Sequence, residues 1–446
     1  MKKPFPFLFD VLPNGVQVAA ESFDNVQSVS IGFFFKSGVL YEKLERLGAS
    51  HFIEHMLFKG TKKRSPKDIA RQFDRIGGHL NAFTSKDYCC YYARVVKDNL
   101  DEAVEVLSDM VCNSQFDEIE LERERGVILE EIKMYEDSPD ELIHELLGLS
   151  LWHNSPLGRP ILGTSATVGG MSRNQIMEIY EKQYIAENMM VCAAGNVDWD
   201  KLRKLLTKHL SGLRTGTFRS KKEVPEPCFE VKVFQKEIEQ VHLALGAPGT
   251  SYGDSRRYAL TLLNMVFGGG MSSRLFQEIR EKRGLAYSVY SYHTAFRDSG
   301  IFAVYAGTSL EHLNRVLDLM YKEVDRVARN GLSKTELSEA KQQIRGNLLI
   351  GMESTTNRMN RLVTEFLYDF QPQKPAEVIQ PFMAVTQDDI SRVAKEILNE
   401  KKMAMTVISP DPRAVDIIRQ SPFSKRPVTS LPISERDRPH RTPKKK

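Results

Sequence analysis

Cysteine is scarce in this sequence, with five among 446 residues, at positions 89, 90, 112, 192 and 228. Their number is odd and no two have C-x-x-C spacing, which argues against a disulfide framework. The adjacent Cys89 and Cys90 would point to opposite faces of a strand, so we do not expect them to pair. The sequence instead predicts buried, reduced thiols in a cytoplasmic protein.

Long apolar runs are also missing. The N-terminus begins with Met1 and two lysines, but Pro4, Pro6 and Asp10 leave no stretch long enough for a signal peptide. No later run is long enough to span a bilayer. The sequence therefore predicts a cytoplasmic protein without a membrane segment.

The chain carries little net charge outside its C-terminal end. The formal charge is +4, and residues 436–446 alone contribute +5, because they hold six basic residues and one acid. The rest of the chain is then at 4 − 5 = −1, which offers no general attraction for nucleic acid or acidic lipid. The basic end lacks a periodic apolar pattern and is expected to be a flexible tail.

Strand and helix patterns alternate through the first half. Asn14-Gly15 predicts a hairpin turn, and Ser65 before Pro66 predicts the start of a helix that ends at Gly77-Gly78. A helix is also expected over 48–58. Apolar spacing predicts further strands over 28–36, 79–84, 88–96 and 189–194, and further helices over 99–111, 117–136 and 198–210.

The second half repeats the order of the first. The segments QVHLALGAPG, NMVFGG and ELSEAKQQIRGN correspond to QSVSIGFFFK, HMLFKG and ELERERGVILEE. Ionisable residues of the first copy fall on apolar or neutral ones in the second: His51 on Leu260, Glu54 on Leu263, His55 on Asn264 and Glu131 on Asn347. The sequence thus predicts a duplication in which only the first copy keeps these groups.

The length and the repeat together predict two domains of about 200 residues each. We expect the first domain over 1–217, a polar linker over 218–228, the homologous second domain over 229–415 and the basic tail over 416–446.

The first copy contains the pentapeptide His51-Phe52-Ile53-Glu54-His55 within an amphipathic helix. Histidines at i and i+4 lie about 40° apart around a helix, so both imidazoles can reach one metal ion. Read backwards the pattern is H-E-x-x-H, in which the glutamate is the general base of a metalloprotease. By itself the pentapeptide also fits a surface helix with two ordinary histidines.

A third ligand is available farther along the chain. A catalytic zinc site has three protein ligands and one open position for water. The helix expected over 117–136 carries Glu124 and Glu131, seven residues apart on one face. Either could be a solvated surface acid, but Glu131 stands among apolar residues, where an unpaired carboxylate would be costly and a cation would compensate.

These motifs resemble those of the pitrilysin/insulinase family of inverted zinc peptidases, and especially the bacterial relatives of the catalytic beta subunit of the mitochondrial processing peptidase. The family pattern is H-x-x-E-H, a metal-binding glutamate about 76 residues later, and another glutamate seven residues before that one. The sequence matches it over roughly residues 5–415, at His51, Glu54, His55, Glu124 and Glu131.

The resemblance implies one zinc ion per chain, held by His51, His55 and Glu131. Of the adjacent Glu130 and Glu131, the spacing favours Glu131. Glu54 would take a proton from the attacking water and deliver it to the leaving amine, and Glu124 would orient a ligand histidine. The implied function is a zinc-dependent endopeptidase.

The resemblance also implies a fold and partners. We expect an α+β fold of two duplicated domains, each an antiparallel-dominated sheet covered by helices, that face each other across a chamber. We expect peptides or unfolded protein segments as substrates. The family's short-chain members imply a homodimer or a heterodimer with a homologous subunit, without nucleic-acid or membrane partners.

Substrate-binding residues are implied in both halves. The strand LNAFTS, with Asn81 and Ala82, would pair with an extended substrate through its backbone, although any hairpin strand reads this way. Arg280 and Tyr287, in IREKRGLAYSV, would bind substrate near the cleaved bond. The preceding GGGMSSRLF lacks G-x-x-x-x-G-K-[ST], so we expect no nucleotide site there.

An acidic pair follows the metal-binding helix. Glu141 and Glu145 are four residues apart and point one way on a helix. They match positions where processing peptidases receive an arginine just before the cut, which predicts a preference for basic residues near the scissile bond. A solvated acidic face is the other interpretation.

Three functions compete on these observations. The first is an active zinc endopeptidase. The second is a non-catalytic homologous subunit of a heterodimeric processing peptidase, since the family includes partners that have lost the motif. The third is a protein with a structural metal, which usually has four protein ligands, often cysteines. The complete motif favours the first.

Overall fold

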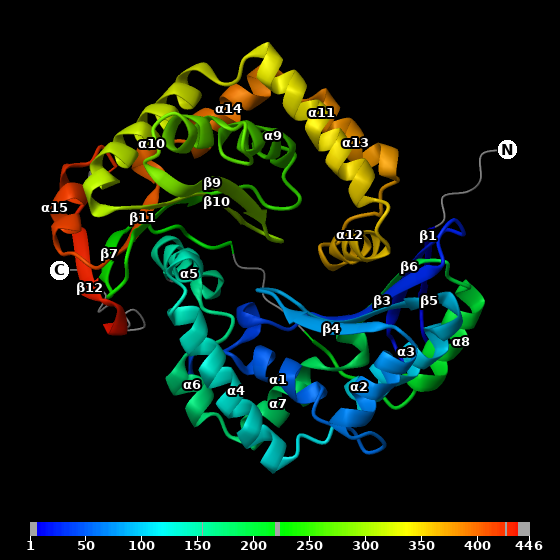
Figure 1. Ribbon diagram of the computed structural model, residues 1–446. Coiled ribbons are helices and arrows are strands. Elements are labelled where there is room, and N and C mark those ends of the chain that lie inside the picture. Colours follow the sequence, from blue (N-terminus) through cyan, green and yellow to red (C-terminus); the bar gives the residue numbers. More distant parts are fainter. Residues whose placement is uncertain (1–6, 154, 219–223, 424–425, 436–446) are drawn as a thin grey trace. The chain divides into compact units, whose positions relative to one another are not determined.

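The computed structural model describes residues 7–153, 155–218, 224–423 and 426–435. Within them the chain forms two compact units, each built around a six-stranded sheet (Figure 1). The expected basic end over 436–446 and residues 219–223 of the expected linker lie outside the described residues.

The sheet of the first unit is mixed but mainly antiparallel. Its strand order is β1-β2-β6-β3-β5-β4, and among the described residues only β2 and β6 run parallel. The expected hairpin is confirmed, because β1 and β2 pair antiparallel across the Asn14-Gly15 turn, where Gly15 has a φ of +98°. The strands are β1 (Phe7–Val11), β2 (Gln17–Ser22), β3 (Ser28–Phe35), β4 (His79–Thr84), β5 (Cys89–Val96) and β6 (Met189–Gly195).

Helices cover both faces of this sheet. Helices α1 and α3 pack on one face, against alternate strand residues such as Phe33 and Phe35, and α12 packs on the other, against Phe34 and Met190 (Figure 1). Helix α2 begins at the expected residue, where Ser65 forms a capping box. The helices are α1 (Ala49–Leu57), α2 (Pro66–Arg75), α3 (Leu100–Asn113), α4 (Glu118–Glu136), α6 (Ser165–Gly170), α7 (Arg173–Gln183), α8 (Trp199–His209) and α12 (Thr355–Leu367).

The sheet of the second unit repeats this arrangement. In its order β12-β7-β11-β8-β10-β9, the last five strands take the places of β2, β6, β3, β5 and β4. Helix α5 packs on β8 and β11, and α9 and α10 lie on the opposite face (Figure 1). The strands are β7 (Val231–Gln235), β8 (Val241–Pro248), β9 (Ala286–Ala295), β10 (Gly300–Thr308), β11 (Ala404–Ser409) and β12 (Val428–Pro432). The helices are α5 (Pro139–Leu151), α9 (Arg257–Phe267), α10 (Leu310–Asn330), α14 (Gln387–Ile397) and α15 (Arg413–Gln420), while α11 (Lys334–Gly351) and α13 (Pro375–Ala384) each continue into the first unit.

The two halves of the sequence exchange a helix. Helix α5 follows α4 in the first half but packs on the second sheet, and α12 follows α11 in the second half but packs on the first sheet. Residues 135–158 therefore belong to the second unit and residues 345–379 to the first. The linear boundaries expected at 217 and 229 do not delimit these units, because local sequence patterns do not report which sheet a helix will cover.

The C-terminal end also differs from the expectation. Helix α15 extends to Gln420, and β12 pairs in parallel with β7 to complete the second sheet. The expectation of a flexible tail over 416–446 is therefore wrong for residues 416–420 and 428–432. Strand β12 occupies the place that β1 has in the first sheet. There it pairs with the backbone N–H and C=O groups at the outer edge of β7. Composition does not reveal such a partner.

Candidate metal centre

Helix α1, which carries the H-x-x-E-H motif, is anchored at its N-terminus by a buried carboxylate. Glu42 accepts hydrogen bonds from the backbone N–H groups of Gly48 and Ser50, at 2.8 and 2.6 Å. The first N–H groups of a helix have no partner inside it, and the helix dipole favours a negative charge there. Burial raises the pKa of Glu42, although the two hydrogen bonds oppose the shift.

Three predicted ligands converge at one point. The Nε2 atoms of His51 and His55 lie 3.7 and 3.5 Å from Glu131 Oε2, and the three ligand atoms all lie within 4.8 Å of one another. Ligand atoms about 2.1 Å from a tetrahedral zinc ion lie about 3.4 Å apart. Two imidazoles and one carboxylate at this spacing fit a zinc site with one open position.

Glu130, the alternative ligand, is turned away from the histidines. Its carboxylate lies 2.6 Å from Lys133 Nζ, and 69% of its side chain is exposed. The Nδ1 atom of His51 is buried and has no hydrogen-bond partner among the described residues. The structure thus brings Glu131, rather than its neighbour, to the pair of imidazoles.

The surroundings shift the pKa values of the two histidines in opposite directions. Burial, followed by the neighbouring His55, lowers the pKa of His51 to about 4, although Glu131 opposes this. Burial also acts to lower the pKa of His55, but hydrogen bonds to Glu131 and Glu124 outweigh it and raise the pKa. The hydrogen bond from His55 lowers the pKa of Glu131.

Glu54 stands beside the predicted ligands and is held by the edge strand. Thr84, the last residue of β4, donates a hydrogen bond from Oγ1 to Glu54 Oε2 at 2.5 Å. Burial raises the pKa of Glu54, and the hydrogen bond from Thr84 opposes the shift. A carboxylate whose proton affinity is raised is suited to accept a proton from water near neutral pH.

Glu124 contacts a predicted ligand, as expected of an orienting residue. His55 Nδ1 donates to Glu124 Oε2 at 3.0 Å, which leaves His55 Nε2 on the side of Glu131. The second oxygen of Glu124 lies 2.7 Å from Lys59 Nζ. The structure therefore places Glu124 between His55 and Lys59.

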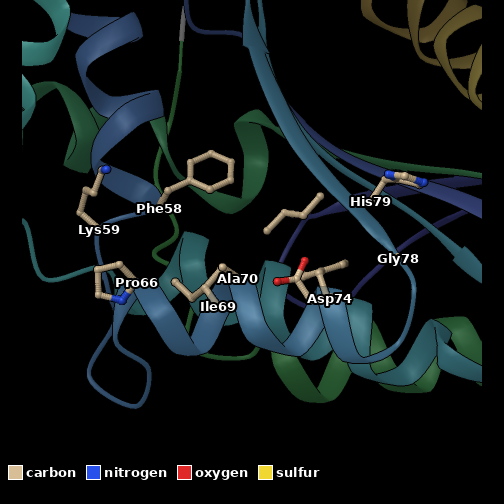
Figure 2. A pocket seen from close by; sticks show the side chains of 10 residues that line it. Phe58, Lys59, Pro66, Ile69, Ala70, Asp74, Gly78 and His79 are labelled. Atoms are coloured by element: carbon tan, nitrogen blue, oxygen red, sulfur yellow. The ribbon is translucent and has the colours of Figure 1, made fainter.

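Strand β4 borders a hollow at the end of α1. Asn81 is exposed and Ala82 is half-buried, and the Asn81 side chain accepts a hydrogen bond from the N–H of Ala82 at 2.8 Å. The cavity has a volume of about 450 Å³. Figure 2 shows Phe58 and Lys59 on one side, Ile69 of α2 below and His79 of β4 on the other side.

Four predicted site residues belong to the second unit. Arg280 stacks on the ring of Tyr287, with its guanidinium carbon 4.8 Å from the ring centroid, and 75% of Tyr287 is exposed. Glu141 and Glu145 lie four residues apart on α5, and the backbone carbonyl of Glu141 accepts from the Tyr135 hydroxyl. Their roles toward a substrate stay predictions.

Glu42, Lys59 and Thr84 were not singled out from the sequence. A signal existed for two of them. Lys59 comes four residues after His55, near one helical turn, and Thr84 shares the strand face of Ala82. For Glu42 there was none, because its contact with α1 depends on the path of an irregular loop.

Comparison with protein families and curated relatives gives clear matches. Residues 17–165 match the family described as Insulinase (Peptidase family M16), and residues 170–344 match the one described as Peptidase M16 inactive domain. An uncharacterized zinc protease of Bacillus subtilis is 40% identical over 89% of this chain and 97% of its own length. One of Streptomyces coelicolor is 39% identical over 90% of this chain and 88% of its own length.

Solved structures share the fold. A peptidase M16 inactive domain from Pseudomonas fluorescens has a TM-score of 0.85 at 21% identity, over 91% of this chain and 98% of its own. A protease from Helicobacter pylori has a TM-score of 0.82 at 22% identity, over 91% and 99%. The expected α+β fold of duplicated domains is confirmed.

Proposed function

Because the chain belongs to the insulinase family of M16 peptidases, we propose that it is a zinc-dependent endopeptidase that cleaves peptides or unfolded protein segments. The observation that carries the proposal is the convergence of His51, His55 and Glu131 beside Glu54. The names of the curated relatives favour zinc as the metal.

The residues divide the work among them. Zinc, when bound, would polarise the scissile carbonyl and make a water molecule acidic near neutral pH. Glu54 takes the proton from that water and passes it to the leaving amine. Thr84 holds Glu54 Oε2, so that the other oxygen of the carboxylate is directed to the water. Glu124 keeps the proton of His55 on Nδ1, which leaves Nε2 as the ligand atom.

Strand β4 is the proposed place for substrate. It is an edge strand, pairing with β5 alone among the described residues, so its outer edge can accept an extended peptide as a further strand. The substrate carbonyl would replace the Asn81 side chain on the N–H of Ala82. The adjacent hollow, with apolar walls from Phe58, Ile69 and Leu80, offers room for a substrate side chain.

The second unit supplies further proposed contacts. Arg280 and Tyr287 would bind the substrate near the cleaved bond, and Glu141 with Glu145 would favour a basic residue there. Replacing both glutamates with glutamine is expected to lower kcat/KM for Arg-containing peptides without changing that for matched Ala-containing peptides. An unchanged ratio of the two values would remove the basic preference.

The central test separates metal binding from chemistry. Glu54→Gln is expected to keep one zinc per chain and to lose at least about 100-fold in kcat, because the amide cannot accept the proton. His51→Ala is expected to lose both zinc and turnover. Glu130→Gln, at the exposed neighbour of Glu131, is the matched control and should change neither. Zinc content by elemental analysis and turnover of quenched fluorescent peptides are the measurements.

The alternative is a non-catalytic homologous subunit of a processing peptidase. The relative from Pseudomonas fluorescens is named as an inactive M16 domain, which gives this alternative its support. If this alternative holds, the wild-type chain by itself cleaves no peptide, even after zinc has been added back. Full turnover by the Glu54→Gln variant would instead sink the assignment of the base.

Assembly and location remain proposals. We propose a homodimer, or a heterodimer with a homologous chain, in the cytoplasm. No helix in the ranges that the structure describes is long and apolar enough to cross a membrane.

A further inference from the structure

Glu124 is held by two groups at once. Its Oε2 accepts from His55 Nδ1 at 3.0 Å, and its Oε1 lies 2.7 Å from the ammonium of Lys59. Only 7% of the Glu124 side chain is exposed. A buried carboxylate therefore bridges an imidazole and an ammonium, with a different donor on each oxygen.

This bridge fixes the ring of His55. A carboxylate held at one oxygen can still rotate about its last bond, and a contact on the second oxygen removes that freedom. An ionised carboxylate only accepts, so with a metal ion bound His55 would carry its proton on Nδ1 and offer the lone pair of Nε2. That Nε2 lies 3.5 Å from Glu131 Oε2, on the side of the other ligands.

The end of α1 places Lys59 for this contact. Helix α1 ends at Leu57, and the N–H of Lys59 donates to the carbonyl of Met56 at 3.0 Å, so the backbone continues the last turn. Glu124 approaches both side chains from α4. Lys59 also balances the charge of Glu124, whose burial without a cation would be costly.

We propose that Lys59 is a positioning residue of the metal centre, which holds Glu124 in the orientation that presents His55 Nε2 to the ion. The inference rests on the proposed function, because it concerns the same ion. Lys59 acts on the ion through Glu124, and zinc affinity is measured without substrate, so its place beside the hollow does not enter the test.

The direction in which zinc affinity changes when Lys59 is replaced distinguishes this positioning role from a simple charge effect. An ammonium near a cation site repels the cation, so removal of Lys59 would tighten zinc binding if its charge alone mattered. If Lys59 positions Glu124, its removal frees the carboxylate and the ring, and zinc binding weakens. Partners of metal ligands typically contribute about 10- to 100-fold in metal affinity.

The experiment compares zinc affinity, by competition with a chromophoric chelator, in the full-length wild type and in Lys59→Met, Lys59→Arg and Lys62→Met. We expect about 10-fold or greater weakening in Lys59→Met, and recovery to within about threefold of wild type in Lys59→Arg, which keeps a cationic donor. Lys62 is exposed on the same loop, so Lys62→Met removes an equal charge and should leave the affinity unchanged. Cobalt(II) in place of zinc gives a visible spectrum that should change in Lys59→Met alone.

A second variant shows whether the effect passes through Glu124. In the Glu124→Gln background, Lys59→Met is expected to change zinc affinity by less than about twofold. Thermal unfolding of each metal-free variant checks that it is folded, and Lys59→Gln, which keeps a donor, replaces Lys59→Met if that variant is not. Unchanged or tighter zinc binding by the folded variant overturns the proposal for Lys59. A wild type that binds no zinc overturns the proposed function instead.

Discussion

Two glutamates of the candidate centre differ in what their surroundings do to them. Burial raises the pKa of Glu54, whereas the hydrogen bond from His55 lowers that of Glu131. A general base must be able to take up a proton, and a metal ligand must stay ionised. The same side chain is thus suited to two tasks by position: beside Thr84 in one case, and between two imidazoles in the other.

The carboxylate of Glu42 should matter for both stability and metal binding. Glu42→Ala leaves the N–H groups of Gly48 and Ser50 buried without an acceptor, which is expected to cost about 2–3 kcal/mol of unfolding free energy. Zinc affinity should fall as well, because α1 carries both histidines. Urea unfolding and chelator competition measure the two effects. Glu45→Ala, an exposed residue of the same loop, is the control, and equal losses in both variants would contradict this role.

Spacing along the chain was enough to predict that His51, His55 and Glu131 lie together, but not which residues support them. His51, Glu54 and His55 lie on one helical turn, and Glu131 follows at a motif-defined distance, so sequence alone brings them together. The contacts of Glu42, Lys59 and Thr84 depend on where a loop, a helix end and a strand end meet α1 and α4. These are tertiary contacts, and no local pattern reports them.

Among the elements, those with local signals were predicted well. The hairpin at Asn14-Gly15 and the capping box at Ser65 are written in a few consecutive residues. The exchange of α5 and α12 between sheets, and the pairing of β12 with β7, involve partners far away in sequence. An amphipathic helix shows that it has a buried face, but not which sheet will bury it.

Helix α12 is tied to the first sheet by a buried ion cluster. Glu21 of β2 is 1% exposed and contacts Arg358 at 2.7 Å and Arg361 at 3.1 Å. Glu21→Ala leaves two guanidiniums without this carboxylate and is expected to lower the unfolding free energy by about 3 kcal/mol. Amide hydrogens of α12 should then exchange faster. The control is Asp200→Ala, an exposed acid of the same unit, and unchanged exchange in α12 would refute this role for Glu21.

A half-buried histidine gives the second unit a pH dependence. His144 of α5 hydrogen-bonds the hydroxyls of Tyr290 and Tyr292, and burial lowers its pKa to about 4. Above pH about 6.5 the His144 side chain is neutral in both the folded and the unfolded state. Between pH about 6.5 and 4, His144 takes up a proton in the unfolded state only. The unfolding free energy therefore decreases as the pH is lowered, by about 1–2 kcal/mol at pH 5.

The variant His144→Gln keeps hydrogen-bonding groups and does not titrate. Its urea midpoint should therefore change less than that of the wild type between pH 7.5 and pH 5. Identical changes in the two proteins would show that the folded protein does not keep His144 neutral over this pH range.

At the scale of the whole molecule, the helix exchange predicts that the halves do not fold separately. Residues 1–217 contain α5 but lack α12, so the sheet face with Phe34 and Met190 would be exposed. We expect this fragment to be insoluble or without cooperative unfolding, and co-expression with residues 218–446 to restore a soluble complex. Fusing residues 345–379 to the fragment should partly rescue it. A monomeric, cooperatively folded fragment 1–217 would contradict the prediction.

The exchange of helices also bears on why a copy without metal ligands persists. Its helix α12 covers the face of the first sheet that lies opposite α1, so deleting the second copy would expose that face. The second copy, which lacks the ionisable residues of the first, is then retained because its helix α12 completes the fold of the first unit. Loss of one half by deletion would disable both.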